Sequence, residues 1–309
     1  MNALPTATNV FIDGATQWVA LLGQPVKHSF SPAMHNAAFS YLEMNWRYGA
    51  FAVATEKLGE AIRGLAALGF RGANVTVPHK EAVMEHLDAV DPAALRLGAV
   101  NTIVFSEGKR TGYNTDGSGF MRGLAEEGVT VAGKSAVILG AGGAARAVIF
   151  ALADAGVRRL TVVNRSADKA EALLKAVVTA TGSDSDGEFP SKRIEYAVCP
   201  WEVEELRHHL EEADLLINAT SLGMVKGGRI EPYPIAIEKW LTGRPFIADL
   251  VYNPVDTILL KTGRDRGMRG QNGLPMLLYQ GVRAFELWTG REAPVEVMQQ
   301  VLKAKMAQP

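Results

Sequence analysis

The segment that most restricts the fold of this chain is a glycine-rich turn between an apolar strand and a helix. Residues 136–139 are apolar, residues 140–145 read Gly-Ala-Gly-Gly-Ala-Ala, and a helical stretch follows at 147–155. This G-x-G-x-x-A order gives a tight turn, a close backbone approach to a pyrophosphate, and a small side chain where helix meets strand. The helix start presents N–H groups to an anion. The segment predicts dinucleotide binding, and a plain glycine-rich turn is the simpler alternative.

The end of the next strand indicates which dinucleotide is bound. NAD-binding units carry an acidic residue there, which binds the ribose 2′-hydroxyl. In this chain the strand 160–163 is followed by Asn164, Arg165 and Ser166, with Lys169 one turn later. A guanidinium can hold a 2′-phosphate, which a carboxylate would repel. We therefore expect NADP(H) as the cofactor. The alternative is that Arg165 and Lys169 form a solvated helix edge.

Short apolar runs alternate with amphipathic stretches along most of the chain. Expected strands are 19–22, 48–53, 73–77, 102–105, 136–139, 160–163, 215–218 and 246–249, and a clear helix covers 58–68. The C-terminal stretches 276–288 and 294–304 also have helical periodicity. Strands that alternate with helices are typical of α/β proteins with parallel sheets. The 309 residues suffice for about two such domains.

Composition argues against several other classes of protein. The 32 Lys and Arg residues against 33 Asp and Glu leave no surplus charge for a nucleic-acid backbone. The first basic residue is Lys27 and the early apolar run 18–22 is short, so we expect neither a leader nor a membrane span. The single cysteine, Cys199, favours a reducing cytoplasm. The six histidines lack metal-ligand spacing, so no metal is expected.

A pair of serines precedes the first expected helix. Pro32 suits the first position of a helix, and Ser31 suits its N-cap. Ser29 has no such structural explanation. Two hydroxyls beside a helix start can also bind a small carboxylate. Capping alone and an anion site therefore both remain open for this segment.

Two further residues are candidates for proton chemistry. Lys80 follows a strand and Pro78, and we expect it in the first turn of a helix, where a cation is locally unfavourable. Such a lysine is a candidate proton donor, although an ordinary surface lysine is the commoner case. Asp116 precedes the amphipathic stretch 118–126, where a helix cap is the simple interpretation. The alternative is a functional role, in which the Asp116 carboxylate lies beside the Lys80 ammonium, holds it in place and keeps it charged.

Nine segments, taken in order, resemble the shikimate dehydrogenase family. They are GQPVKHSFSPAMHNAAF, GANVTVPHK, GAVNT, YNTDG, GAGGAARA, NRS, INATSLGM, DLVYNP and GLPMLLYQGVRAFELWTG. Together they extend over nearly the whole chain and are very specific. The resemblance implies reversible NADPH-dependent reduction of 3-dehydroshikimate to shikimate in chorismate and aromatic amino-acid biosynthesis. It implies a small-molecule substrate, no nucleic acid and no membrane, and it allows a monomer or a homodimer.

The resemblance also implies roles for individual residues. Ser29 and Ser31 would bind the substrate carboxylate, and Lys80 and Asp116 would form the catalytic pair at the C4 hydroxyl. Further implied substrate contacts are Thr76, Asn101, Tyr252 and Gln280. Implied cofactor contacts are Gly140, Ala141, Gly142, Gly143, Ala144, Asn164, Arg165, Ser166, Lys169, Thr220, Leu250 and Gly273. The family often has Arg where Lys169 stands, so selectivity for the 2′-phosphate could be looser here. His79 stands where many members have an aromatic residue.

The motif order predicts two α/β domains, the first of them interrupted. We expect a substrate-binding domain of residues 1–115 completed by C-terminal helices at 273–309, and a Rossmann-type NADP-binding domain of residues 116–272. The substrate is expected in the cleft between them. Quinate/shikimate and aminoshikimate dehydrogenases are the nearest alternatives. A non-catalytic NADP- or shikimate-binding sensor is the alternative from another class.

Overall fold

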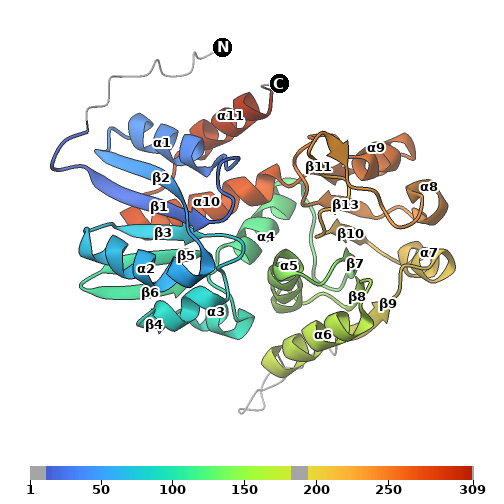
Figure 1. Cartoon of the computed structure of the whole chain (residues 1–309). Coiled ribbons are helices and arrows are strands. Elements are labelled where there is room, and N and C mark those ends of the chain that lie inside the picture. Colours follow the sequence, from blue (N-terminus) through green and yellow to red (C-terminus); the bar gives the residue numbers. More distant parts are fainter. Residues whose placement is uncertain (1–11, 182–193, 308–309) are drawn as a thin grey trace. The chain divides into compact units, whose positions relative to one another are not determined.

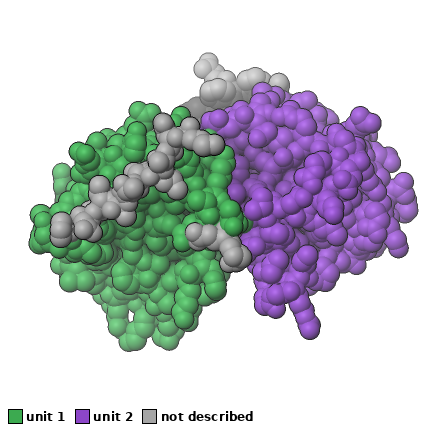
Figure 2. Space-filling model, turned by 90° about the horizontal axis from the view of Figure 1, so that it is seen from above, with its two compact units in different colours: residues 1–115, 278–309 green, residues 116–277 purple. Residues whose placement is uncertain are grey.

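The structure is a computed structural model that describes residues 12–181 and 194–307 (Figure 1). The chain divides into two compact units, as Figure 2 shows by colour. Unit 1 comprises residues 1–115 and 278–309, and unit 2 comprises residues 116–277. The return to the first unit therefore falls inside the helix α10 (Leu274–Thr289), whereas the sequence suggested residue 273.

Unit 1 is built on a six-stranded mixed sheet in the order β2-β1-β3-β5-β6-β4. The strands are β1 (Gln17–Gly23), β2 (Trp46–Ala52), β3 (Gly72–Val75), β4 (Ala89–Val90), β5 (Thr102–Ser106) and β6 (Lys109–Tyr113). Strand β1 pairs in parallel with β2 and β3, but β5 is antiparallel to both β3 and β6. The sequence analysis expected parallel sheets, so the antiparallel pairs of β5 are a departure from that expectation. Glu107 and Gly108 have positive φ values of 51° and 74°, which suit the two-residue turn of a hairpin.

Helices pack on both faces of this sheet. They are α1 (Ser31–Tyr41), α2 (Leu58–Ala67), α3 (Pro92–Leu97), α10 and α11 (Val295–Met306), with short 3₁₀ helices η1 (Thr55–Lys57) and η2 (Ala82–His86). The apolar stripe of α2, Leu58, Ile62 and Leu65, packs with Leu22 and Val75 of the sheet. Alternate residues of a strand point to opposite faces. Val19, Leu21 and their neighbours therefore face the other way, toward the aromatic side chains of α1 and α10.

Unit 2 contains a parallel six-stranded sheet in the order β14-β13-β10-β7-β8-β9. These strands are β7 (Ser135–Leu139), β8 (Arg159–Val163), β9 (Glu195–Cys199), β10 (Leu215–Asn218), β13 (Phe246–Asp249) and β14 (Gly270–Gln271). The connecting helices are α4 (Asp116–Glu126), α5 (Gly143–Asp154), α6 (Ala167–Thr181), α7 (Val203–Glu211), α8 (Ile237–Trp240) and α9 (Ile258–Asp265). A hairpin, β11 (Val225–Lys226) and β12 (Arg229–Ile230), precedes α8. This is the doubly wound Rossmann order, with the chain reversal between β7 and β10, and it confirms the predicted α/β fold.

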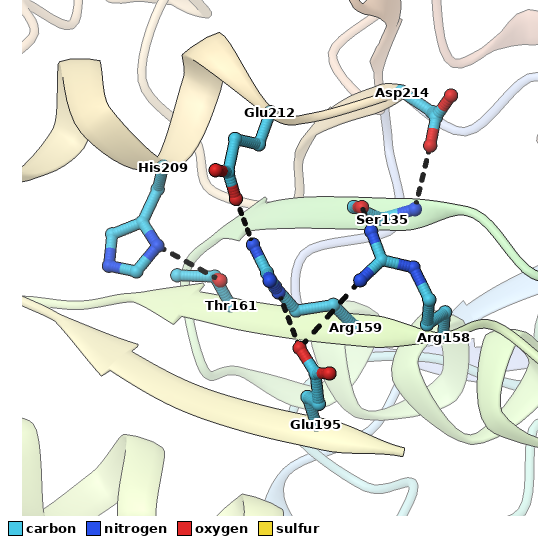
Figure 3. Close-up of polar contacts among 8 residues, drawn as sticks. All are labelled: Ser135, Arg158, Arg159, Thr161, Glu195, His209, Glu212 and Asp214. Atoms are coloured by element: carbon cyan, nitrogen blue, oxygen red, sulfur yellow. Dashed lines mark hydrogen bonds and ion pairs between the residues drawn. The ribbon is translucent and has the colours of Figure 1, made fainter. Parts of the chain in front are cut away.

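Polar side chains join the amino ends of β7, β8 and β9 (Figure 3). The residues drawn are Ser135, Arg158, Arg159, Thr161, Glu195, His209, Glu212 and Asp214. Arg159 Nε donates to Glu195 Oε2 at 2.8 Å, and its Nη1 donates to Glu212. Ligands of such sheets bind beyond the carboxyl ends of the strands. We therefore interpret this network as a structural connection between the amino ends of the strands, on the side of the sheet opposite the ligand-binding ends.

The described residues contain few features of other chemistries. None of their helices is long and apolar enough to cross a membrane. No group of three His, Cys, Asp or Glu among them is arranged to hold a metal ion. Cys199 is buried at the end of β9, and burial raises the pKa of its thiol to about 12, so the thiol is a poor nucleophile.

Candidate active site

The two serines differ in what their side chains contact. Helix α1 begins at Ser31, Phe30 occupies the N-cap position, and the Phe30 side chain makes no capping hydrogen bond. The predicted N-cap role of Ser31 is therefore wrong. The backbone N–H of Ser31 donates to Ser29 Oγ at 3.3 Å. The Ser31 hydroxyl instead hydrogen-bonds Tyr48 of β2, and Ser31 is only 6% exposed.

Thr76 and Lys80 lie in the segment that follows β3. The N–H of Thr76 donates to the Leu22 carbonyl at 2.9 Å, which continues the sheet by one residue. A Cβ at Gly23 would lie 2.3 Å from Thr76 Cγ2, so a side chain there would displace Thr76. Helix η2 begins at Ala82 with Glu81 at its N-cap, so Lys80 precedes the helix. The argument that placed Lys80 in a helical first turn is therefore wrong, although the Lys80 carbonyl is fixed by the Val100 N–H at 2.8 Å.

Asn101 is 2% exposed and both ends of its side chain are hydrogen-bonded. Its Nδ2 donates to Thr115 Oγ1 at 3.0 Å. Its Oδ1 accepts from the Thr115 N–H at 2.8 Å and from Thr102 Oγ1 at 2.9 Å. Asp116 follows Thr115 as the first residue of α4 and is buried. This arrangement fixes the chain at the point where the second unit begins.

Gln280 is half-buried on α10, next to Gly281. A Cβ at Gly281 would lie 2.2 Å from Met34 Cε of α1. Glycine therefore lets α10 approach the helix that carries Ser31. Long-range packing of this kind explains how a residue near the C-terminus reaches the first unit.

The glycine-rich turn has the geometry that a dinucleotide needs. Gly140 has a φ of 104°, where a side chain is disfavoured, and a Cβ there would lie 2.7 Å from Thr220 Cγ2. Gly142 is the N-cap of α5 and no side chain caps that helix. A Cβ at Gly142 or Gly143 would meet nothing within 4 Å. The start of α5 thus has open space where side chains would project, which leaves room for a phosphate close to its backbone.

The residues after β8 present exposed cations. Asn164 Nδ2 donates to the Ser166 carbonyl at 2.9 Å and closes a short turn. Arg165 and Lys169 are exposed. Neither side chain forms an ion pair with another of the described residues. The pKa of Glu231 is lowered by hydrogen bonds from Lys226 and Ser221, and also by the charge of Arg165. These features fit a 2′-phosphate site with a free guanidinium.

The loops after β10 and β13 are held by a buried pair that the sequence analysis missed. Asp249 Oδ1 accepts from Asn218 Nδ2 at 2.8 Å and from the Val251 N–H at 3.1 Å, and Asp249 Oδ2 accepts from Thr257 Oγ1 at 2.6 Å. Asn218 Oδ1 in turn accepts from Thr220 Oγ1 at 2.6 Å. Burial raises the pKa of Asp249 to about 6. Both residues lie in segments of the resemblance, at the carboxyl ends of strands, which is a signal that could have identified them.

Leu250, Tyr252 and Gly273 lie on the same edge of unit 2. A Cβ at Gly273 would lie 2.1 Å from the Leu250 carbonyl oxygen, and the Gly273 N–H donates to the Val251 carbonyl at 3.1 Å. Tyr252 is half-buried, and burial raises the pKa of its phenol. With residues 140–144 and Thr220, these residues follow the carboxyl ends of β7, β10, β13 and β14. Ligands of doubly wound sheets bind beyond the carboxyl ends of the strands, which is where these residues lie.

Comparison with known proteins identifies the family. Three family models match: the shikimate dehydrogenase substrate binding domain at residues 21–103, shikimate / quinate 5-dehydrogenase at 123–185, and the shikimate 5'-dehydrogenase C-terminal domain at 273–303. The shikimate dehydrogenase (NADP(+)) of Moorella thermoacetica is 52% identical over 295 residues, which cover 96% of this chain and 95% of that protein. The chain belongs to the shikimate dehydrogenase family. Members of this family with solved structures share its fold.

Two of these structures were solved with the cofactor. A shikimate dehydrogenase in complex with NADP⁺ is 42% identical, with a TM-score of 0.85 over 96% of this chain and 98% of that one. The shikimate 5-dehydrogenase of Thermus thermophilus, in complex with NADP(H) and shikimate, is 37% identical, with a TM-score of 0.79 over 94% of this chain and 100% of that one. The shikimate dehydrogenase resemblance drawn from the nine segments is confirmed.

Proposed function

We propose that this chain is an NADP-dependent shikimate dehydrogenase, which interconverts shikimate and 3-dehydroshikimate in aromatic amino-acid biosynthesis. Its family membership and its full-length match to NADP-dependent enzymes support this activity. One observation carries the proposal further. In unit 1 a buried hydrogen-bonded network joins Ser31 and Asn101, residues that the family motifs assign to the substrate. We assign unit 1 to the substrate and unit 2 to NADP.

For the substrate, we propose that Ser29 and Ser31 donate hydroxyl hydrogen bonds to the carboxylate of shikimate. The Ser31 hydroxyl does not cap α1 and hydrogen-bonds the neutral phenol of Tyr48, a bond that it can exchange for one to a carboxylate. Thr76, Asn101 and Gln280 are proposed contacts of the ring hydroxyls, with Tyr252 as a further contact. Hydroxyl and amide groups can donate and accept, which suits a polyhydroxylated ring.

For the chemistry, we propose that Lys80 exchanges a proton with the reacting hydroxyl and that Asp116 orients this hydroxyl. When NADP⁺ is bound it supplies a hydride acceptor. In the reducing direction Lys80 gives its proton to the developing alkoxide as a general acid, which typically contributes about 10²–10⁴ in rate. The carbonyl of Lys80 is fixed by Val100, so its side chain begins from a defined position. Positioning of the two reactants contributes the remainder.

For the cofactor, we propose that residues 140–144 bind the pyrophosphate and that Arg165 and Lys169 bind the 2′-phosphate. Asn164, Ser166 and Thr220 are proposed to hydrogen-bond the nucleotide, and Leu250 and Gly273 to lie beside the nicotinamide. The uncapped start of α5 and the exposed cations after β8 support this assignment. We also propose a cytoplasmic location, which a single buried cysteine favours.

The test is NADPH formation, followed at 340 nm, with shikimate and NADP⁺ as substrates. Quinate and NAD⁺ serve as alternative substrates, because a matching family model covers quinate enzymes too. We expect shikimate with NADP⁺ to give the highest kcat/KM. Ser31 and Asn164 support this preference, since quinate enzymes tend to have threonine and an acid at these positions. Shikimate binding without any turnover would instead favour a sensor.

Two variants test the catalytic roles. Lys80→Ala should retain less than a tenth of the wild-type turnover, and Asp116→Asn should also lose turnover. Lys57→Ala, which removes an exposed lysine paired with Glu60 in the same unit, is the matched control and should keep full activity. Turnover of Lys80→Ala above a tenth of wild type would refute the proposed proton transfer. Sedimentation of the wild type will distinguish a monomer from a homodimer.

A further inference from the structure

Tyr48 of β2 reaches across the sheet of unit 1 to a residue two strands away. The register pairs Val19 with Tyr48 and Leu21 with Asn74, and alternate residues of a strand share a face. Tyr48 and Asn74 therefore point to the same face, on either side of β1. The Tyr48 hydroxyl lies 2.8 Å from Asn74 Oδ1, and Tyr48 is 4% exposed. A buried polar group at this position must have partners.

The partners of Asn74 determine the direction of this hydrogen bond. Asn74 Nδ2 lies 3.1 Å from the carbonyl oxygen of Asn101, which can only accept. The amide nitrogen must therefore face Asn101, and Oδ1 must face Tyr48. The phenol accordingly donates its single proton to Asn74. Asn74 Nδ2 also lies 3.1 Å from Thr102 Oγ1, which itself donates to Asn101 Oδ1 at 2.9 Å.

This direction constrains Ser31. The hydroxyl of Ser31 hydrogen-bonds Tyr48. Because the phenolic proton is already donated to Asn74, Tyr48 can only accept from Ser31. In the free protein this hydrogen bond holds the Ser31 side chain in one orientation. Because a hydroxyl has a single proton, Ser31 gives up the bond to Tyr48 when it donates to a substrate carboxylate. One phenol therefore contacts Ser31 on one side and, through Asn74, fixes Asn101 on the other.

Aromatic packing keeps the Tyr48 ring in place. The His35 ring stacks on it at 4.7 Å with an interplanar angle of 8°, and the Trp288 ring lies at 6.0 Å. Trp288 is itself fixed, since its Nε1 donates to the Ile103 carbonyl at 2.9 Å. His35 is fully buried, and neither of its ring nitrogens has a hydrogen-bond partner among the described residues. The contribution of His35 here is therefore packing, whereas that of Tyr48 includes its hydroxyl.

We propose that Tyr48 is a positioning residue for the substrate, which sets the spacing between the carboxylate-binding Ser31 and the hydroxyl-binding Asn101. The inference rests on the proposed function. Its chemical consequence is selectivity for a cyclic hydroxy acid whose carboxylate and ring hydroxyls match this spacing. Tyr48 orients Ser31 before the substrate binds and fixes Asn101 through Asn74, and it does not exchange a proton with the substrate.

The first test is Tyr48→Phe, which keeps the ring and removes the hydroxyl. Loss of a buried hydrogen-bond partner should raise the KM for shikimate by about tenfold. The kcat should stay within about threefold, and the KM for NADP⁺ should not change, because the lost contact serves substrate binding. Tyr41→Phe, at the exposed end of α1, is the matched control. An unchanged KM for shikimate in Tyr48→Phe would overturn the proposal.

Two further variants separate positioning from simple loosening of the core. His35→Phe perturbs the same aromatic cluster and keeps the Tyr48 hydroxyl, so its KM for shikimate should stay near the wild-type value. An equal rise in His35→Phe and Tyr48→Phe would contradict the proposal. Thr102→Val removes the hydroxyl that contacts Asn74 and Asn101, and it should also raise this KM. It provides an independent result if Tyr48→Phe does not fold.

A double-mutant cycle tests the route through Ser31. If Tyr48 acts through Ser31, the double variant Ser31→Ala/Tyr48→Phe should have a KM no more than about threefold above that of Ser31→Ala. Fully multiplicative effects would show that Tyr48 acts independently of Ser31. The wild-type assay separates the two levels of inference. No turnover of shikimate by the wild type would refute the proposed function, whereas normal turnover with an unaffected Tyr48→Phe would refute this inference alone.

Discussion

His79 Nε2 lies 2.8 Å from the carbonyl oxygen of Val53, at the end of β2, and this contact fixes the tautomer of the ring. A carbonyl oxygen can only accept, so Nε2 carries the proton and donates it. His79 is fully buried, and its Nδ1 has no partner among the described residues. The bond ties the residue before Lys80 to the residue that directly follows β2, two strands away from β3 in the sheet. We therefore interpret His79 as an anchor for Lys80.

Replacing His79 tests this anchor. His79→Phe fills a similar volume but leaves the Val53 carbonyl without its donor, so we expect a loss of about 1 kcal/mol in the free energy of unfolding. The pH dependence of kcat should keep its shape, because the ring does not exchange protons with Lys80. Urea denaturation and a pH–rate profile measure these two effects. A displaced pH profile would show that His79 tunes the reaction.

Burial of His35 makes the protein sensitive to acid. Burial lowers the pKa of His35 from 6.5 to about 3, so the unfolded chain binds the proton more tightly. Its contribution to stability is full above pH 6.5 and falls as the pH drops toward 3, by about 2 kcal/mol between pH 6.5 and 5. His35→Phe should lack this loss and unfold at lower pH than the wild type. The exposed His208→Phe is the control for acid titrations.

Asp249 should give a dependence of the opposite sign. Burial raises its pKa from 3.8 to about 6, so the folded state binds the proton more tightly. Stability from this group is full below pH 3.8 and is lost as the pH rises to 6, by up to about 3 kcal/mol. The stability difference between wild type and Asp249→Asn should therefore fall as the pH rises from 4 to 6. Asp256→Asn, an exposed aspartate paired with Arg264, provides the comparison in urea titrations.

Asp249 also carries a kinetic expectation. Its carboxylate accepts three hydrogen bonds that hold the loops after β10 and β13. An amide cannot accept all three, so Asp249→Asn should loosen the turn at Thr220. We expect a higher KM for NADP⁺ in this variant and no comparable change for Asp256→Asn. If Asp249→Asn and Asp256→Asn had equal KM values for NADP⁺, the buried pair of Asn218 and Asp249 would have no role in cofactor binding.

Arg165 should determine the preference between the two dinucleotides. Arg165→Ala removes a guanidinium proposed to bind the 2′-phosphate, which should raise the KM for NADP⁺ by about 10–100-fold. The KM for NAD⁺ should change little, because NAD⁺ lacks this phosphate. Lys169→Arg should lower the KM for NADP⁺, since a planar fork binds phosphate better than a point charge. Arg264→Ala is the surface control. An equal rise in KM for NADP⁺ and NAD⁺ in Arg165→Ala would show that Arg165 does not bind the 2′-phosphate.

The network at the amino ends of β7, β8 and β9 should not matter for catalysis. Arg159 contacts Glu195 and Glu212, but all three side chains are partly exposed (Figure 3). Exposed ion pairs contribute little and are screened by salt. Arg159→Met should therefore lower the melting temperature by no more than about 2 °C, and by less in high salt. Its KM values should equal those of the wild type, and a large kinetic effect would contradict the assignment of the ligand edge.

The main elements could be predicted because their signals are local. The helix at Leu58, Ile62 and Leu65 follows from helical periodicity, and the turn at residues 140–145 follows from glycine spacing between strand and helix. The antiparallel β5–β6 pair was harder, since it depends on a two-residue turn at Glu107 and Gly108 that resembles many polar loops. The starts of α1 and η2 were wrong by one or two residues, which was enough to place Ser31 at an N-cap and Lys80 in a first helical turn.

The sequence by itself determined the α/β class, the dinucleotide turn, the absence of an acid after β8 and the family, because each depends on residues close together in the chain or on the order of motifs. Only the tertiary structure decided the direction of the hydrogen bonds among Ser31, Tyr48 and Asn74. These residues belong to α1, β2 and β3, and their contacts depend on strand register and on a ring packed between helices. The glycine-rich turn marks where NADP binds, but register and packing fix the groups that would select the substrate.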